Sequence, residues 1–232
     1  MTINRNSHVS TVATEAPATI RIFQEYGLDF CCGGKRPLAD ACAERGIDVD
    51  LLVARLQTVT TDGGADRNWQ TAPLCDLVAH IQQRFHGPLR EELPRLAAMM
   101  AKVVSRHGDH LPQTLHPLQA TLTELQDDLL QHMAKEDRLL FPAIVAAEAG
   151  ESAAASWIDQ PIAVMEAEHD DAGRALARMR ELTGDYTPPE WACPTFRGLY
   201  YGLAELEREM HLHVHLENNI LFPRAASTAV VG

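Results

Sequence analysis

The stretch HMAKEDRLLFPAI, residues 132–144, is repeated in outline by HVHLENNILFPRA, residues 213–225. In both stretches a histidine precedes a glutamate by four positions, and Leu-Phe-Pro follows the glutamate after three further residues. A spacing of four residues places two side chains on the same face of a helix, one turn apart. The repeat therefore predicts two helices that each present one His-Glu pair to a common interior.

Apolar residues three and four positions apart extend from each His-Glu pair, as expected for the buried stripe of a bundle helix. The first stripe contains Leu118, Leu122, Leu125, Leu129, His132, Glu136 and Leu139. The second contains Leu199, Leu203, Leu206, Met210, His213, Glu217 and Ile220. Two further stripes contain one histidine each: Ile162, Met165, His169, Ala172, Leu176 and Met179, and His86, Leu89, Leu93, Leu96 and Met100. The sequence thus predicts two copies of a helix pair that together turn four histidines and two glutamates inward.

The predicted fold is all-α. Long helical patterns cover residues 73–106, 115–149, 161–183 and 188–224, and strand patterns are nearly absent. Short connections between these patterns favour an up-down four-helix bundle. Shorter helices are expected near 18–26, from 37 to 46 and over 48–60, with Asp48 as the N-cap of the last. The glycine-containing stretch 61–68 predicts a linker, so the expected domains are 1–62, small and helical, and 69–226, the bundle.

Charge and composition exclude several classes of protein. The chain of 232 residues has 20 basic and 32 acidic side chains, for a formal charge of -12. This balance, without a basic cluster, argues against a nucleic-acid or membrane partner. No apolar run approaches the roughly 20 residues that span a bilayer, and the N-terminal stretch lacks the apolar segment of a secretory signal. Five cysteines, two of them adjacent, indicate a reduced cytoplasmic protein.

Six polar side chains on the predicted core stripes need an explanation. A metal-free bundle accounts for a single hydrogen-bonded histidine, but burying an unpaired carboxylate costs several kcal/mol. Four imidazoles and two carboxylates exceed the needs of one tetrahedral zinc and suit iron or manganese. We therefore expect two metals bridged by Glu136 and Glu217, with two histidines each. The spacing leaves open which histidines share a metal. The histidines off the stripes, His80, His211 and His215 among them, are expected to face solvent, with support of the metal ligands as the alternative for His80 and His211.

Two groups of motifs resemble known families. The repeated histidine and His-x-x-x-Glu pattern, ending in Leu-Phe-Pro, resembles a hemerythrin-like di-iron domain. It has four histidines where oxygen-carrying hemerythrins have five, which argues against reversible oxygen carriage. The stretch FQEYGLDFCCGGKRPLADAC, residues 23–42, resembles the N-terminal domain of the repair-of-iron-centres family. WQTAPLCDLVAHI, VMEAEHDDAG and HVHLENNILFP follow in the order of that family, so the resemblance covers about residues 12–226.

The resemblance implies a cytoplasmic protein that repairs iron–sulfur clusters damaged by nitrosative or oxidative stress, by donating iron. It implies two oxo- or hydroxo-bridged iron ions, O2 or NO as small ligand, and damaged iron–sulfur proteins as partners. The implied metal ligands are the six residues that the stripes select: His86, His132, Glu136, His169, His213 and Glu217. The alternatives from other classes are a sensor of O2 or NO, a nitric oxide reductase or peroxidase on the same metals, and a metal-free bundle.

Cys31 and Cys32 lie in a glycine-ended loop beside Lys35 and Arg36, just before the expected helix start at Pro37. Nearby cations and a helix N-terminus lower the pKa of a thiol, so the pair is expected to act in redox chemistry or as a soft metal ligand. The alternative is two small buried apolar side chains. We expect the loop to dock near the open end of the bundle, where it would pass electrons to the metals or receive iron. An exposed thiol loop could also join two chains in a homodimer. Cys42, Cys75 and Cys193 are interpreted as structural.

Overall fold

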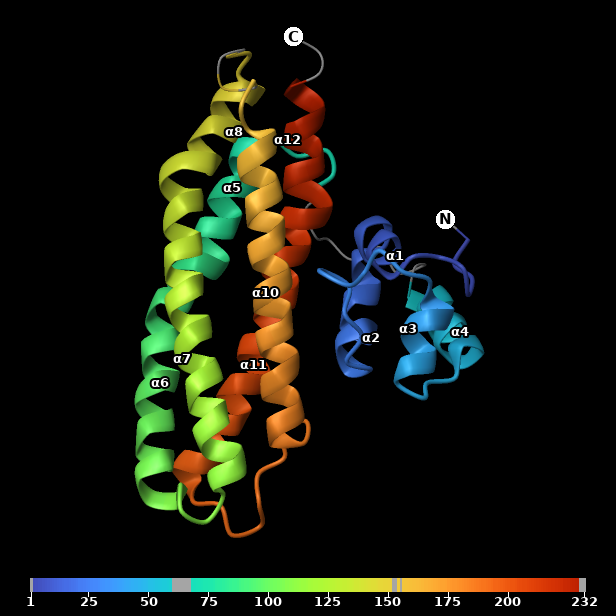
Figure 1. Cartoon of the computed structure of the whole chain (residues 1–232). Coiled ribbons are helices and arrows are strands. Elements are labelled where there is room, and N and C mark those ends of the chain that lie inside the picture. The colour runs from blue at the N-terminus through green and yellow to red at the C-terminus, as the bar shows by residue number, and fades with distance from the viewer. Residues whose placement is uncertain (1, 60–67, 152–153, 155, 230–232) are drawn as a thin grey trace.

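The computed structural model describes residues 2–59, 68–151, 154 and 156–229. Over these residues every regular element is a helix, and the β-type pairing that the structure describes is one isolated bridge between His8 and Pro37. Figure 1 shows a long four-helix bundle with a smaller group of helices beside it. The predicted all-α, up-down architecture is therefore confirmed. The predicted linker, residues 61–68, lies outside the described residues except for its last position.

The first, second and fourth helices of the bundle are each built from consecutive segments, and the third is a single helix. The first is α5 (Leu74–Ile81), η2 (Gln82–His86) and α6 (Gly87–His107); the second is α7 (Pro112–Lys135), η3 (Glu136–Leu140) and α8 (Phe141–Glu148). The third is α10 (Asp159–Thr183); the fourth is α11 (Pro194–Leu216), η4 (Glu217–Leu221) and α12 (Phe222–Ala229). Because α7 packs against α6 and α10, and α11 packs against the same two helices, the bundle is closed. The fourth helix begins at Pro194 and not near residue 188, since proline suits the first helical position.

The segments η2, η3 and η4 are single π-helical turns, each next to the middle of the bundle. A π turn contains more residues than an α turn, so it shifts the face that later residues present. Across η3, Leu139 is 63% exposed whereas Leu140 is 2% exposed. The prediction that Leu139 lies in the core was wrong, because it extended α-helical spacing through this turn. His86, Glu136 and Glu217 each lie at one end of a π turn.

Two apolar clusters fill the bundle on either side of a polar layer. One contains Leu93, Leu125 and Leu203 among its members, and the other contains Ile144 and Phe222. Along the helices, the buried histidines and glutamates fall where one cluster gives way to the other. Burying one large apolar side chain stabilises a fold by about 1.5–3 kcal/mol, so the clusters hold the helices while the layer between them can be polar.

The N-terminal segment (residues 2–59) has an apolar core of its own that includes Phe23, Leu28 and Leu52. Its helices are α1 (Val9–Glu15), η1 (Pro17–Thr19), α2 (Ile20–Glu25), α3 (Leu38–Glu44) and α4 (Val49–Val59). The predicted N-cap is confirmed, since the Asp48 carboxylate accepts hydrogen bonds from the backbone N–H groups of Asp50 and Leu51 at 2.9 and 3.2 Å. The sequence did not predict α1, which packs against η4 of the bundle.

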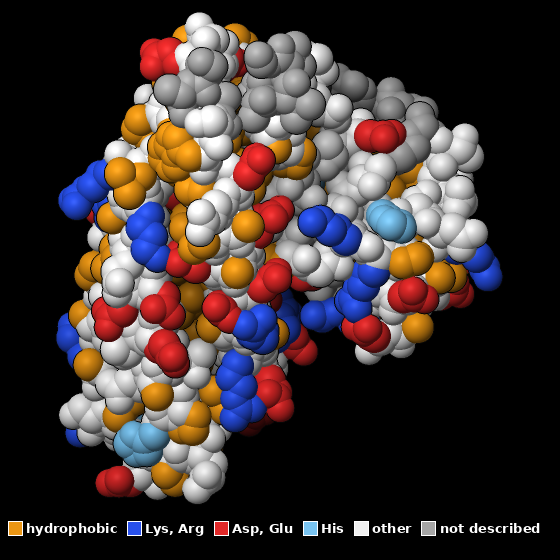
Figure 2. All heavy atoms as spheres, turned by 45° about the horizontal axis from the view of Figure 1, so that its top comes forward, with side chains coloured by type: hydrophobic (Ala, Val, Ile, Leu, Met, Phe, Trp, Pro, Cys, Tyr) orange, Lys and Arg blue, Asp and Glu red, His pale blue; other side chains and the backbone are white. Residues whose placement is uncertain are grey.

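None of the described helices combines the length and the apolar character needed to cross a membrane. On the face shown in Figure 2, basic side chains lie among acidic ones and do not gather into a patch of their own. On this face the mixed distribution agrees with the acidic formal charge of -12.

Candidate metal centre

The structure brings the six side chains predicted as metal ligands together in the polar layer of the bundle. None of the six is more than 3% exposed. They come from all four bundle helices: His86 from η2, His132 from α7, Glu136 from η3, His169 from α10, His213 from α11 and Glu217 from η4. Their side chains form two groups, each with ligand atoms within 4.8 Å of one another.

Each group pairs one histidine from each half of the chain. The Nε2 atoms of His86 and His213 lie 3.0 Å apart, and those of His132 and His169 lie 2.9 Å apart. The spacing along the helices left open which histidines lie together, and the structure shows these two facing pairs. The two copies of the helix pair do not form two separate sites. Each copy contributes one histidine to each group, as a pseudo-twofold arrangement requires.

The two glutamates belong to both groups. Oε1 of Glu217 lies 2.9 Å from His213 Nε2, and its Oε2 lies 3.1 Å from His169 Nε2, so one carboxylate spans the two groups. Oε2 of Glu136 lies 3.3 Å from His132 Nε2 and 3.4 Å from His86 Nε2. Carboxylates placed in this way can bridge two cations.

Three of the imidazoles are oriented through their Nδ1 atoms. His86 Nδ1 lies 2.9 Å from Asp137, His132 Nδ1 lies 2.9 Å from Glu168, and His169 Nδ1 lies 2.8 Å from the side-chain oxygen of Asn218. An Nδ1–H group that donates to such an oxygen leaves Nε2 as a lone-pair donor aimed into the site. Two facing Nε2 lone pairs repel each other unless a proton or a cation lies between them.

The repeated Leu-Phe-Pro motif supports the same histidines from the next turn. Phe141 stacks on His86 with ring centroids 5.5 Å apart, and Phe222 stacks on His169 with centroids 6.0 Å apart. Each phenylalanine is the first residue of the α-helix that follows a π turn, with the proline in its first turn. The phenylalanine of each motif therefore holds an imidazole of another helix in place. Each copy of the sequence repeat supplies a His-Glu pair and also a phenylalanine that supports a histidine elsewhere in the site.

Buried atoms without partners test whether a cation fits here. Among the described residues, neither carboxylate oxygen of Glu136 has a hydrogen-bond partner, and the same is true of Glu217 Oε2 and His213 Nδ1. A buried acceptor that stays unpaired costs about 1–3 kcal/mol, and a charged one costs more. Metal ions would satisfy the carboxylates and separate the facing imidazoles, so the residues present fit a pair of cations.

Without metal, protons supply the missing positive charge. Burial alone would lower the pKa of His86, but the hydrogen bond to Asp137 and the nearby carboxylates of Glu136 and Glu217 outweigh it and raise that pKa to about 11. Burial likewise opposes the charge of Glu136 on His132, whose pKa is raised to about 9. Burial would raise the pKa of Glu217, yet His213 and His169 hold it well below its usual value. The layer thus carries ionised carboxylates that demand compensating cations.

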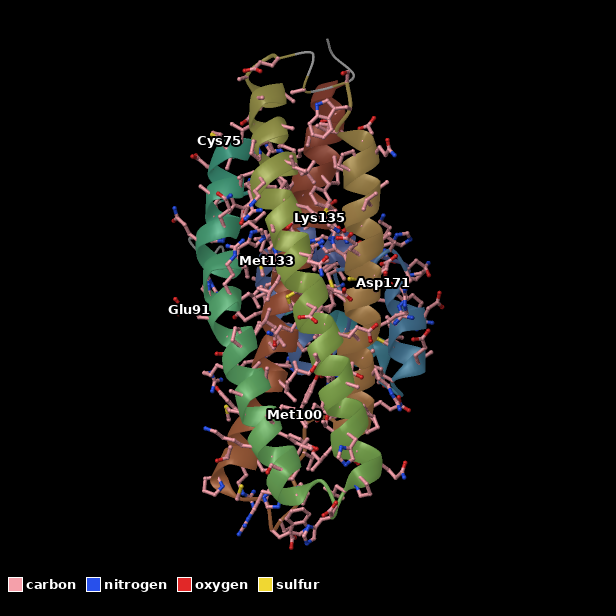
Figure 3. All side chains as sticks on the ribbon, turned by 60° about the vertical axis from the view of Figure 1, so that its left-hand side comes forward. Cys75, Glu91, Met100, Met133, Lys135 and Asp171 are labelled. Carbon is pink, nitrogen blue, oxygen red and sulfur yellow. The ribbon has the colours of Figure 1, made fainter. Side chains whose placement is uncertain are left out.

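A cavity of about 250 Å³ connects the outside of the bundle to one of the two groups. It lies between α7 and α10, and both His132 and His169 line it. Lys135 on α7 and Asp171 on α10, which also line the cavity, are labelled in Figure 3. The group formed with His86 and His213 does not line this cavity.

The Cys-Cys loop (residues 29–34) lies beside this metal centre. Sγ of Cys32 is 3.4 Å from the backbone oxygen of His169, and a Cβ added at Gly173 would lie 3.4 Å from the same sulfur. The Sγ atoms of Cys31 and Cys32 are 3.4 Å apart, and neither cysteine forms a disulfide. The loop therefore docks against the side of the bundle, not near its open end as the sequence analysis expected.

Three expectations about this loop are corrected by the structure. Cys31 is only 2% exposed and packs into a core cluster of the bundle, so it does not offer an exposed thiol for a homodimer. Its pKa is raised well above the usual value by burial, the Cys32 hydrogen bond and Asp29, not lowered. Arg36 pairs instead with Glu44 at 2.6 Å, and Lys35 is exposed.

His215 was expected to face solvent, and this prediction was wrong. It is 2% exposed, and its ring packs edge-on against Phe30 of the Cys-Cys loop with centroids 5.5 Å apart. The ring of Phe30 also packs edge-on against that of His211, with centroids 5.9 Å apart. Bundle residues off the core stripe were read as exposed, because the face that the N-terminal segment covers cannot be seen in the periodicity of a single helix.

Comparison with known proteins agrees with this geometry. Residues 77–225 match the Hemerythrin HHE cation binding domain, and residues 5–60 match a domain of unknown function, DUF542. Fold and site together thus define a hemerythrin-like, cation-binding helical bundle with an N-terminal helical segment. The chain is 44% identical to the iron-sulfur cluster repair protein YtfE of Musicola paradisiaca, over 95% of this chain and 96% of that protein.

The proteins of the same name from Dickeya chrysanthemi and Pectobacterium atrosepticum are each 43% identical, over 95% of this chain and 97% of theirs. The chain belongs to this family of iron-sulfur cluster repair proteins. The resemblance stated from the sequence motifs is confirmed.

Proposed function

We propose that this chain repairs iron–sulfur clusters damaged by nitrosative or oxidative stress, and that it does so by supplying iron. The relatives that carry this name match nearly the whole chain. The single observation that carries the proposal is the buried layer of four imidazoles and two carboxylates with unpartnered oxygens. Damaged iron–sulfur proteins are the proposed partners, the proposed domains are 1–62 and 69–226, and the proposed location is the cytoplasm.

The proposed ligands are His86, His132, Glu136, His169, His213 and Glu217, and the proposed cofactor is a pair of iron ions with an oxo or hydroxo bridge. Mixed imidazole and carboxylate ligands suit iron. When bound, iron would supply a redox-active cation that can bind O2 or NO and a stock of metal for donation. The residues of the chain orient the ligands: Asp137, Glu168 and Asn218 hold three imidazoles by Nδ1.

The cavity between α7 and α10 supports a route for a small ligand or for iron. It reaches His132 and His169 from outside, and Cys32 contacts the backbone of the same His169. Cys31 and Cys32 are proposed to assist by handling iron or electrons at this point. Thiolates are ligands for soft and borderline cations, and Cys32 lies against the backbone of a proposed ligand, although neither cysteine lines the cavity.

Two neighbouring histidines on the fourth bundle helix test the metal site with a matched control. His213 and His215 are both buried, two residues apart, but only His213 points into the metal centre. We expect His213→Gln to lose most bound iron and the optical spectrum of an oxo-bridged pair, while His215→Gln keeps both. Iron analysis and spectra of oxidised and reduced protein give the answer. About one zinc per chain in wild-type protein, or equal iron in both variants, would contradict the di-iron proposal.

The role of the thiols is tested by replacing both cysteines. We expect Cys31→Ala/Cys32→Ala protein to bind as much iron as the wild type, because neither thiol is a member of the two ligand groups. Its ability to reactivate a purified [4Fe-4S] dehydratase damaged by NO should be lost. Unimpaired reactivation by this variant would remove the thiols from the proposal, and steady consumption of NO without any acceptor protein would favour a reductase instead.

A further inference from the structure

Asp29 is the first residue of the Cys-Cys loop, and its carboxylate has no role in the proposed function. Its Oδ1 accepts hydrogen bonds from the backbone N–H groups of Cys31 at 2.9 Å and Cys32 at 3.1 Å, and its Oδ2 accepts one from Gly33 at 2.8 Å. Oδ1 also accepts a hydrogen bond from the Cys31 thiol, with Sγ at 3.2 Å. One carboxylate therefore organises the loop backbone and one of its two thiols.

The two glycines of the loop make room for this arrangement. A Cβ at Gly33 would lie 2.8 Å from Oδ2 of Asp29, and a Cβ at Gly34 would lie 2.7 Å from the backbone oxygen of Phe30. Neither glycine has a positive φ, so close approach and not backbone conformation requires them. Gly33 is thus coupled directly to the position of the Asp29 carboxylate.

The two thiols have different surroundings. Cys31 is 2% exposed and is bonded to Asp29, whereas Cys32 is half-buried and contacts the His169 carbonyl beside the cavity. Burial alone would raise the pKa of Asp29, but the charge of His211 and hydrogen bonds from Cys31 and Gly33 hold it below its usual value. The ionised carboxylate therefore favours the protonated form of the Cys31 thiol.

We propose that Asp29 sets the order in which the two thiols react: Cys32 reacts first, because the Asp29 carboxylate accepts a hydrogen bond from the buried Cys31 thiol and so keeps Cys31 protonated. This order rests on the proposed use of the pair in handling iron. As Cys32 binds a thiophilic cation such as Fe²⁺, its S–H bond is replaced by an S–metal bond and its proton goes to solvent. Cys31 then makes the same exchange more slowly, and its proton also goes to solvent. Each sulfur donates one electron pair, and no oxidation occurs.

Limited alkylation measures this order without any repair assay. The reduced, iron-loaded, full-length protein is treated with limiting iodoacetamide, and each cysteine peptide is quantified over time by mass spectrometry. Cys75, which is exposed, and Cys42, which is buried, are internal references for reactive and protected thiols. We expect Cys32 to react at least about tenfold faster than Cys31, as exposure and thiolate character dictate. Equal rates, or faster reaction at Cys31, overturn the proposal.

Two variants isolate the contribution of the carboxylate. Asp29→Asn removes its charge, and Gly33→Ala displaces it, so each should bring the two alkylation rates to within about threefold of each other. Asp29→Asn should also move the pH profile of Cys31 alkylation to lower pH, a shift that mere loosening of the loop would not produce. Asp40→Asn, at an exposed acid in α3, is the control that changes neither.

An unchanged rate ratio in either folded variant contradicts the role of Asp29. Iron content and melting temperature show whether each variant folds. If one variant does not fold, the other variant and the ratio of the two alkylation rates in wild-type protein still test the proposal. A failure of the proposed function is distinguishable, because Cys31→Ala/Cys32→Ala protein would then still repair clusters whatever the alkylation order.

Discussion

The metal centre and the Cys-Cys loop are adjacent buried polar clusters that satisfy their carboxylates in opposite ways. At Glu136 both oxygens lack a hydrogen-bond partner among the described residues, whereas the oxygens of Asp29 accept four hydrogen bonds from the loop itself. An unsatisfied buried carboxylate makes the fold dependent on a cation, while a satisfied one is part of the fold. The difference separates a binding site from a structural support, and it can be tested.

The largest expected effect is the loss of stability when metal is removed. A cation at about a thousand times its Kd stabilises by about 4 kcal/mol, and about 2–4 °C accompanies each kcal/mol in a chain of this size. We therefore expect chelation to lower the melting temperature of wild-type protein by about 10 °C or more. Glu136→Gln should abolish this difference. Asp29→Asn should lower the melting temperature both with and without metal but keep the difference between the two. If that difference were lost in Asp29→Asn protein, the contrast between the metal centre and the Cys-Cys loop would be wrong.

Smaller effects are expected at the oxygens that orient the imidazoles. Asp137→Asn and Glu168→Gln should each weaken iron affinity by about 10–100-fold, because Nδ1 of His86 or His132 loses its charged acceptor. Competition with a chelator of known affinity measures the change. Glu181→Gln, at an exposed site near the end of α10, is the control. Unaltered affinity in both variants would show that the ligands are positioned by packing alone.

The contact between the two clusters is probed at Gly173, where a Cβ would lie 3.4 Å from Cys32 Sγ. Gly173→Val should push the Cys-Cys loop from α10 at a cost of about 1–3 kcal/mol, as overpacking generally does. Iron content should be retained, and hydrogen exchange at residues 29–34 should rise. Ala163→Val, at an exposed position of the same helix, should change neither quantity. Loss of iron in Gly173→Val protein would mean that the loop supports the metal ligands themselves.

The smallest effect is a pH dependence of the same contact. Burial against the N-terminal segment lowers the pKa of His215 to about 4, despite the backbone oxygen of Phe30. Because docking lowers the pKa of His215, the docked state has its full stability at pH values above about 6.5, the pKa of the undocked histidine. The contact then weakens as pH falls from 6.5 toward 4, by up to about 1.4 kcal/mol per unit. Hydrogen exchange at residues 29–34 between pH 7 and 5 should show this slope in wild-type protein and a flatter one in His215→Gln.

Much of the fold followed from periodicity. Apolar spacing of three and four residues predicted the bundle and selected the six polar residues at its centre, because each helix has to bury one face. The exceptions have definite causes. Leu139 was misplaced by the π turn at Glu136–Leu140, and α1 was missed because its few apolar residues follow a polar start.

The sequence by itself determined that the bundle has a histidine and glutamate layer, since six polar residues at core positions are costly without a cation. Only the tertiary structure decided that His86 pairs with His213 and His132 with His169, and that Cys31 lies buried against the bundle. The physical reason is that spacing along one helix fixes which face a residue takes. Which residue of another helix meets that face depends on the packing of the whole chain.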